Sequence, residues 1–229
     1  NSRTSESRDW KQAYSCINIC NMVLASVNDL SVNNQVEELQ KKRIKGEAHF
    51  LRALYYFTLG NLYGQPYCTK TLNTPAIPIK LTEYVEDKHY ERTPVAEVYA
   101  SIISDLKIAA TYLDGTTQTT KRRANVDAAR AMLSRVYLYM AGEENWKNCV
   151  AMCDSVLKSR RYSLLDINDH EPKKDFIFLD SPETIFTQGK CSARNPIFMG
   201  QTMVATYMLT QDLLGKYDAD VDLRYSHWF

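Results

Sequence analysis

The chain has 229 residues, enough for one large domain or two small ones, and 45% of them are hydrophobic. With 15 tyrosines and 8 glycines, its composition is that of an ordered, aromatic-rich globular protein and not of a disordered one. The formal net charge is +1, which excludes an overall field that would gather nucleic acid or an anionic membrane. No apolar run approaches the roughly 20 residues that a membrane-spanning helix needs.

Two helices are predicted in the first 63 residues. The first spans about 9–30, and only a short polar break separates it from the second, at about 35–63. So short a connection favours an antiparallel pair. The second helix needs protein partners on two faces, because it has two apolar stripes. One stripe contains Ile44, Ala48, Leu51, Tyr55, Leu59 and Leu62, and the other contains Phe50, Leu54 and Phe57.

A long segment with several prolines follows, at about 65–92. Proline argues against a helix here, and connections of this length in compact domains are often functional. Sugar rings are commonly bound by flat apolar faces beside a few hydrogen-bonding groups. We therefore predict that any ligand contact of the chain comes from this segment, with four candidate side chains: Tyr67, Tyr84, His89 and Tyr90. In the alternative interpretation, the tyrosines pack the segment against the helices.

Three more helices are predicted after this segment. Thr93 and Pro94 favour a helix start, with Thr93 as the N-cap and Pro94 as the first helical residue, and an apolar stripe continues to residue 113. The next helix is expected to start at the cap residue Asn125 and to end at Gly142, and the fifth is expected at 145–158.

The predicted fold is mainly α, with tetratricopeptide-like antiparallel helix pairs that form an α/α superhelix and a loop-rich tail that contains short strands. We expect a single domain over 1–229, with a helical-repeat body at 1–160 and the mixed tail at 161–229. The repeat comparison rests on a loose match at Gly142, Trp146, Cys149, Cys153 and Val156. The tail predictions are strands at 162–165, 176–179 and 184–188 and a helix at 206–217.

The sequence contains no constellation typical of an active site. The four histidines are scattered, and His49 lies on the predicted buried helix, where a packing role is the simpler interpretation. The acidic run 218–222 imitates the start of a calcium loop but lacks the glycine that such a loop needs. Six cysteines favour packing over metal binding or a disulfide, and the basic run 121–123 is interpreted as a solvated turn. We therefore expect no enzymatic activity, no metal and no cofactor.

Several motifs are specific only in combination. Residues 46–57 read Gly-Glu-Ala-His-Phe-Leu-Arg-Ala-Leu-Tyr-Tyr-Phe, followed by Leu-Tyr-Gly at 62–64, and residues 92–99 read Arg-Thr-Pro-Val-Ala-Glu-Val-Tyr. Further matches lie at 125–139, 162–164 and 183–186 and at Asp222-Leu-Arg224. Together these segments resemble the SusD/RagB family of outer-membrane nutrient-binding lipoproteins from Bacteroidetes.

The resemblance implies an exported, non-catalytic lipoprotein on the outer membrane at the cell surface. Such a protein is anchored through a lipidated cysteine, here expected upstream of Asn1, and works with a SusC-like TonB-dependent transporter to capture glycans for import. Family members are longer, so the chain is expected to be an N-terminal portion. The helix pairs alone leave a second function open, a tetratricopeptide-like scaffold that binds a peptide or protein partner.

Overall fold

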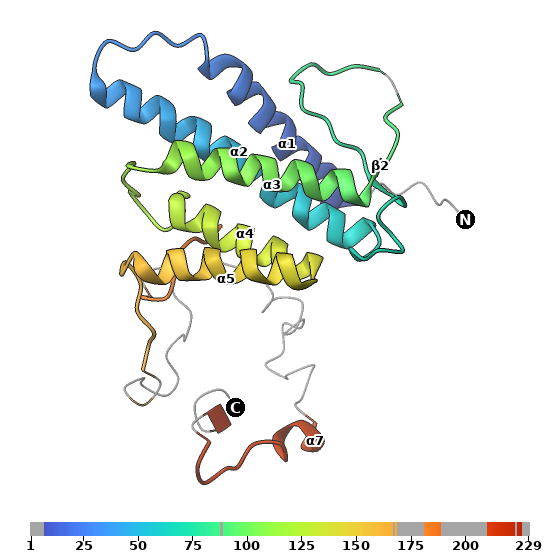
Figure 1. Ribbon diagram of the computed structural model, residues 1–229, viewed down its shortest axis with the longest axis vertical. Coiled ribbons are helices and arrows are strands. Elements are labelled where there is room, and N and C mark those ends of the chain that lie inside the picture. Colours follow the sequence, from blue (N-terminus) through green and yellow to red (C-terminus); the bar gives the residue numbers. More distant parts are fainter. Residues whose placement is uncertain are drawn as a thin grey trace, which may run out of the picture. The chain divides into compact units, whose positions relative to one another are not determined.

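The computed structural model describes residues 7–87, 89–166, 168, 181–188, 210–222 and 224–225. The chain divides into two compact units, Asn1–Arg161 and Tyr162–Phe229. The described part of the first unit contains five helices, in the order α1 (Arg8–Val27), α2 (Gln35–Tyr63), α3 (Val95–Leu113), α4 (Val126–Met140) and α5 (Glu143–Lys158). Consecutive helices pack against one another and run in alternating directions, as Figure 1 shows. The predicted tetratricopeptide-like, mainly α fold is therefore confirmed.

The ends of the helices follow local capping chemistry. Asn34 caps α2 by accepting a hydrogen bond from the Glu37 amide at 3.0 Å, and Asn125 caps α4 by accepting one from the Ala128 amide at 2.8 Å. The structure confirms the predicted bounds of α2 and the predicted end of α5, but α5 begins two residues earlier than expected, at Glu143.

The predicted start of α3 was wrong by one residue, because a small sheet precedes this helix. Strand β1 (Pro75–Ile77) pairs antiparallel with β2 (Thr93–Pro94), with Thr93 opposite Ile77 and an irregularity in the register between the two pairs. Thr93 is thus a strand residue, and its hydroxyl accepts a hydrogen bond from the Ile79 amide at 3.2 Å. Pro94 occupies the N-cap position of α3 without a side-chain hydrogen bond.

The core of the first unit lies between α2 and its neighbours α1 and α3. The predicted stripe on α2 is only partly right, since Leu51 and Tyr55 are half-buried and Leu62 is 63% exposed. Because α2 packs between two helices, its buried surface is offset from that stripe. At Gly46 a Cβ atom would lie 2.6 Å from Leu113 Cγ, so only glycine permits this close approach of α2 and α3. The largest fully buried apolar side chains are Ile17, Tyr56, Leu59, Ile77, Val95, Val98, Ile102, Leu106, Leu113 and Val136.

Helix α5 and the second unit differ from the predictions in detail. No residue of α5 is fully buried among the residues the structure describes, so the positions matched to an inner repeat face, Trp146 among them, are exposed or half-buried. The tail segments 162–165 and 184–188 are not strands, and 176–179 lies outside the described residues. The expected helix at 206–217 corresponds to the shorter α7 (Gln211–Leu214), while 206–209 is not among the described residues.

Over the described parts, no helix is long and apolar enough to cross a membrane.

Candidate ligand-binding loop

The predicted functional segment, residues 65–92, connects α2 to β2 and contains the short strand β1; we call it the long loop. We call residues 66–80 the root of the loop and residues 81–87 its tip. The root returns along the helices, and its backbone caps α3, because the carbonyls of Leu72 and Thr74 accept hydrogen bonds from the Ala96 and Val95 amides at 3.0 and 3.1 Å. The first amides of a helix have no partner within it, so the root completes the start of α3.

Two tyrosines of the helices, half-buried Tyr14 and buried Tyr56, hold the end of the root. The Tyr14 hydroxyl of α1 donates to the Pro78 carbonyl at 2.7 Å. The Tyr56 hydroxyl of α2 bonds both backbone groups of Lys80, donating to the carbonyl at 2.6 Å and accepting from the amide at 2.8 Å. Burial raises the pKa of Tyr14 and raises that of Tyr56 to about 12, so both phenols stay protonated and can donate at neutral pH.

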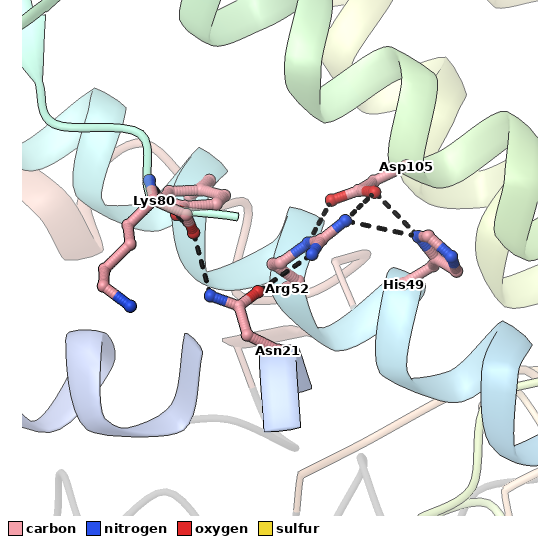
Figure 2. Close-up of polar contacts among 6 residues, drawn as sticks. Asn21, His49, Arg52, Lys80 and Asp105 are labelled. Atoms are coloured by element: carbon pink, nitrogen blue, oxygen red, sulfur yellow. Dashed lines mark hydrogen bonds and ion pairs between the residues drawn. The ribbon is translucent and has the colours of Figure 1, made fainter. Parts of the chain in front are cut away.

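Asn21 of α1 connects the loop to a buried charged cluster (Figure 2). Its amide nitrogen donates to the carbonyls of Lys80 and Thr82 at 2.9 and 3.1 Å, and its amide oxygen accepts from Arg52 Nη1 at 2.8 Å. Arg52 of α2 also donates to both carboxylate oxygens of Asp105 of α3, at 2.8 and 2.7 Å. One chain of hydrogen bonds therefore joins α1, α2, α3 and the loop.

The charged cluster is structural, since its partners satisfy one another. His49 Nδ1 lies 2.8 Å from Asp105 Oδ1, so three nitrogen atoms surround the buried carboxylate. Burial raises the pKa of Asp105, but the hydrogen bonds from Arg52 and His49 outweigh it and hold the pKa below its usual value. A carboxylate that stays ionised and faces a bidentate arginine is suited to fixing geometry and not to moving a proton. The predicted packing role of His49 agrees with this arrangement.

The tip of the loop presents apolar and aromatic side chains to solvent. Leu81 is 53%, Tyr84 68% and Val85 90% exposed. A hydrogen bond with Glu83 raises the pKa of the Tyr84 hydroxyl, and the Tyr90 hydroxyl donates to Glu86 at 2.6 Å. Aromatic faces with carboxylates at their edges offer both stacking surfaces and hydrogen-bond acceptors, which are the groups that a polyhydroxylated ligand requires.

The four predicted contact residues occupy different environments. Tyr84 and His89 are exposed, and Tyr90 is half-buried. Tyr67 is half-buried in the root, with its ring centroid 4.8 Å from that of Tyr99 on α3. The role of all four in ligand binding stays a prediction.

Sequence reasoning missed the residues that anchor the loop and two exposed residues of its tip. Asn21 is buried on α1, and a polar residue at a buried helical position is the signal that could have identified an anchor. No comparable signal in the sequence distinguishes exposed Leu81 and Val85 from core residues.

The comparisons with known proteins decide the family. Residues 2–138, more than half of the chain, match a SusD-like family described as "Starch-binding associating with outer membrane". The chain belongs to the SusD-like family. SusD-like protein P25 of Formosa agariphila is 27% identical over 165 residues, which are 71% of this chain and 28% of that protein. SusD-like protein P2 of the same organism is 30% identical over 132 residues, which are 56% of this chain and 23% of that protein.

Solved structures agree with this assignment. A putative sugar binding protein from Bacteroides vulgatus superposes on the SusD-like chain with a TM-score of 0.65 and 31% identity, over 72% of this chain and 36% of that one. A SusD-like carbohydrate binding protein from the same species gives a TM-score of 0.65 and 27% identity, over 78% of this chain and 36% of that one. The SusD-like chain thus spans about a third or less of the length of these relatives.

Proposed function

We propose that this SusD-like chain belongs to a non-catalytic, cell-surface glycan-binding protein and that the tip of the long loop contacts the glycan. The single observation that favours this most is the contrast within one loop. Its root, together with Thr82 at the start of the tip, is hydrogen-bonded to side chains of α1 and α2, while the rest of the tip exposes Tyr84 beside carboxylates. A rigidly held loop presents an aromatic face at a low ordering cost when a ligand binds.

The chemistry of the tip fits a neutral glycan better than an acidic one. Glu83, Glu86 and Asp87 lie in the tip beside Tyr84, and they would repel carboxylate or sulfate groups. Their oxygens can instead accept hydrogen bonds from sugar hydroxyls, while the rings of Tyr84 and Tyr90 stack on the apolar faces of a sugar. The description of the family as starch-binding supports this choice of ligand class.

The proposal extends to the setting of the protein. A family described as associating with the outer membrane supports an exported lipoprotein, held by a lipid anchor upstream of Asn1. We place it beside a SusC-like TonB-dependent transporter, to which the captured glycan passes. Pull-down of such a transporter with the full chain from outer-membrane extracts tests this partnership, and recovery of other proteins alone would contradict it.

Glycan binding is tested with a glycan array followed by calorimetry on the full chain. Tyr84→Ala should weaken binding of a neutral glycan by about threefold to tenfold, as expected for the loss of one aromatic stacking contact. Tyr84→Phe keeps the ring and removes the hydroxyl, so it should bind nearly as well as the wild type. Unchanged affinity in both Tyr84→Ala and Tyr90→Ala, with an intact fold by circular dichroism, would overturn the proposed site.

The absence of catalysis is tested separately. Incubation of the purified chain with the polysaccharides that it binds should release no new reducing ends. Product formation that a single carboxylate substitution abolishes would show a glycosidase instead.

A further inference from the structure

Two basic segments that are far apart in the sequence meet at one end of the helical array. Segment 41–47 is part of α2, and segment 121–123 belongs to the connection between α3 and α4. The Arg123 guanidinium joins them, because its Nε donates to Glu47 Oε1 at 2.9 Å and its Nη2 contacts Glu47 Oε2. Figure 1 shows the start of α2 and the α3–α4 connection at the same end of the array. We call the surface formed by these two segments the basic edge.

The basic edge is strongly positive although the whole chain has a net charge of only +1. Its acid, Glu47, is already paired with Arg123. The nearest acids along the sequence, Glu38 and Asp127, lie outside both segments. Asp127 is buried and pairs with Arg130 and Arg161. The seven cations of the basic edge are Lys41, Lys42, Arg43, Lys45, Lys121, Arg122 and Arg123. So dense a local charge attracts anions even where the overall charge does not.

Several of these cations are accessible. Lys42 and Arg122 are exposed, and the Arg123 side chain remains 45% exposed while it contacts Glu47. Arginine has five N–H donors, and the contacts with Glu47 involve two nitrogen atoms of the guanidinium. Lys45 lies with its Nζ 5.5 Å from the centroid of the half-buried Tyr112 ring, so an aromatic side chain adjoins the cations. Lys41 is not proposed as a ligand contact, because its ammonium group donates to two backbone carbonyls of the α1–α2 connection.

We infer that the basic edge binds an anionic polysaccharide, with Lys42, Lys45 and Arg122 pairing with its carboxylate or sulfate groups. A polymer with regularly spaced acidic groups can engage several cations at once and releases bound counterions as it does so. The description of the family as starch-binding favours a sugar polymer over a phospholipid surface. The Tyr112 ring beside Lys45 is itself stacked on His49, with 6.2 Å between the ring centroids, so the cations and not this ring are the proposed contacts. The inference rests on the proposed function, to which it adds a second, acidic class of glycan at a separate surface from the loop tip.

The test compares two forms of one polymer. Polygalacturonate bears a carboxylate on each sugar, and its methyl-esterified form has the same backbone without the charge. Binding of the full chain is measured by biolayer interferometry at several salt concentrations. We expect binding of polygalacturonate that weakens steeply with salt, and at least tenfold weaker binding of the esterified polymer. Equal binding of both polymers, or no binding of polygalacturonate at low salt, would overturn the inference.

Matched variants locate the site. The triple variant Lys42→Gln, Lys45→Gln and Arg122→Gln should weaken polygalacturonate binding about tenfold and lower the slope of log affinity against log salt by about 2 to 3. The control Lys11→Gln, Lys70→Gln and Lys147→Gln removes the same charge from exposed positions outside the basic edge and should change neither quantity by more than about twofold. Equal losses in the two variants would show a general charge effect and contradict the site.

Two further measurements distinguish an anionic polysaccharide from an anionic membrane, and the basic edge from the loop tip. Vesicles with a quarter phosphatidylglycerol test an anionic membrane surface, and binding to vesicles without binding to polygalacturonate would overturn the glycan assignment. Neutral glycan binding is measured on the same triple variant, which should retain it. Loss of polygalacturonate binding with retained neutral binding supports both proposals, whereas failure of neutral binding in the wild type would count against the loop tip alone.

Discussion

The root and the tip of the long loop are adjacent in the sequence but differ in composition and in how they are held. The root, 66–80, contains three prolines and two lysines and no acid, whereas the tip, 81–87, contains three acids. The root ends at Lys80, whose two backbone groups are both bonded by the Tyr56 hydroxyl. Four residues later Tyr84 is 68% exposed, and the next residue, Val85, is 90% exposed. The conformation of the root is therefore fixed by side chains of the helices, and the tip extends from a fixed base.

This difference indicates how the helices can hold the loop in place whatever side chains its tip carries. The anchoring atoms belong to Tyr14, Asn21 and Tyr56, and they contact the loop only through backbone carbonyls and amides. Backbone contacts do not depend on the loop side chains, so the side chains of the tip can change without disturbing the core. The following predictions test whether the root is part of the fold and whether the tip is not.

Removal of the buried carboxylate should have the largest effect. Asp105→Ala leaves the Arg52 guanidinium buried without its bidentate partner, and we expect a loss of about 3 to 5 kcal/mol in the free energy of unfolding. Chemical denaturation followed by circular dichroism measures this loss. The control Asp154→Ala removes an exposed carboxylate 3.9 Å from Lys158 and should cost less than about 0.5 kcal/mol. Similar losses in the two variants would show that the buried cluster does not stabilise the fold.

A smaller effect is expected where single hydroxyls hold the root. Tyr56→Phe leaves the amide and carbonyl of Lys80 without this partner and should cost about 1 to 3 kcal/mol. Tyr14→Phe removes the one bond to Pro78 and should cost about 0.5 to 1.5 kcal/mol. Hydrogen exchange should increase at the Lys80 amide in Tyr56→Phe more than in Tyr14→Phe. The reverse order would mean that the root is not held as described.

The helices could be predicted from the sequence because their signals are local. Asn125 caps α4 as expected, and the apolar spacing that predicted α2 from about 35 to 63 matches its observed bounds. The sheet at Thr93 could not be predicted in the same way, since its partner strand lies at 75–77 and pairs through backbone atoms. A local helix-start signal at Thr93 and Pro94 was overridden by this distant pairing.

The candidate site was only partly predictable, because some of its contacts join residues that are far apart in the sequence. Proline content and length identified the loop, and its aromatic residues suggested the contact residues. The division into root and tip depends on Asn21, Arg52 and Asp105, which lie on three different helices and meet only in the folded chain. Likewise, the basic run at 121–123 gave no indication that it lies beside 41–47, because the contact of Arg123 with Glu47 spans 76 residues.

The pH dependence of stability tests whether the buried Asp105 carboxylate is ionised in the folded chain. The folded pKa of Asp105 lies below the unfolded value of about 3.9, so the unfolded state binds more protons as the pH falls through this range. The stability due to Asp105 is therefore complete above about pH 4 to 5 and is lost as the pH falls through the lower folded pKa. Denaturation between pH 6 and pH 3 should show a steeper loss for the wild type than for Asp105→Asn. Parallel profiles would indicate that the carboxyl is not held ionised in the fold.

The smallest effect on stability is expected at the tip, where function and folding should separate. Tyr84 is 68% exposed, so Tyr84→Ala should change the free energy of unfolding by less than about 0.5 kcal/mol. The same change is expected to weaken neutral glycan binding, whereas Tyr56→Phe should alter stability first and binding only through the position of the loop. Thermal unfolding measures the stability of both variants, and calorimetry measures their affinity for the neutral glycan. A destabilisation above about 1 kcal/mol in Tyr84→Ala would place the tip within the folded core, and the contrast between root and tip would fail.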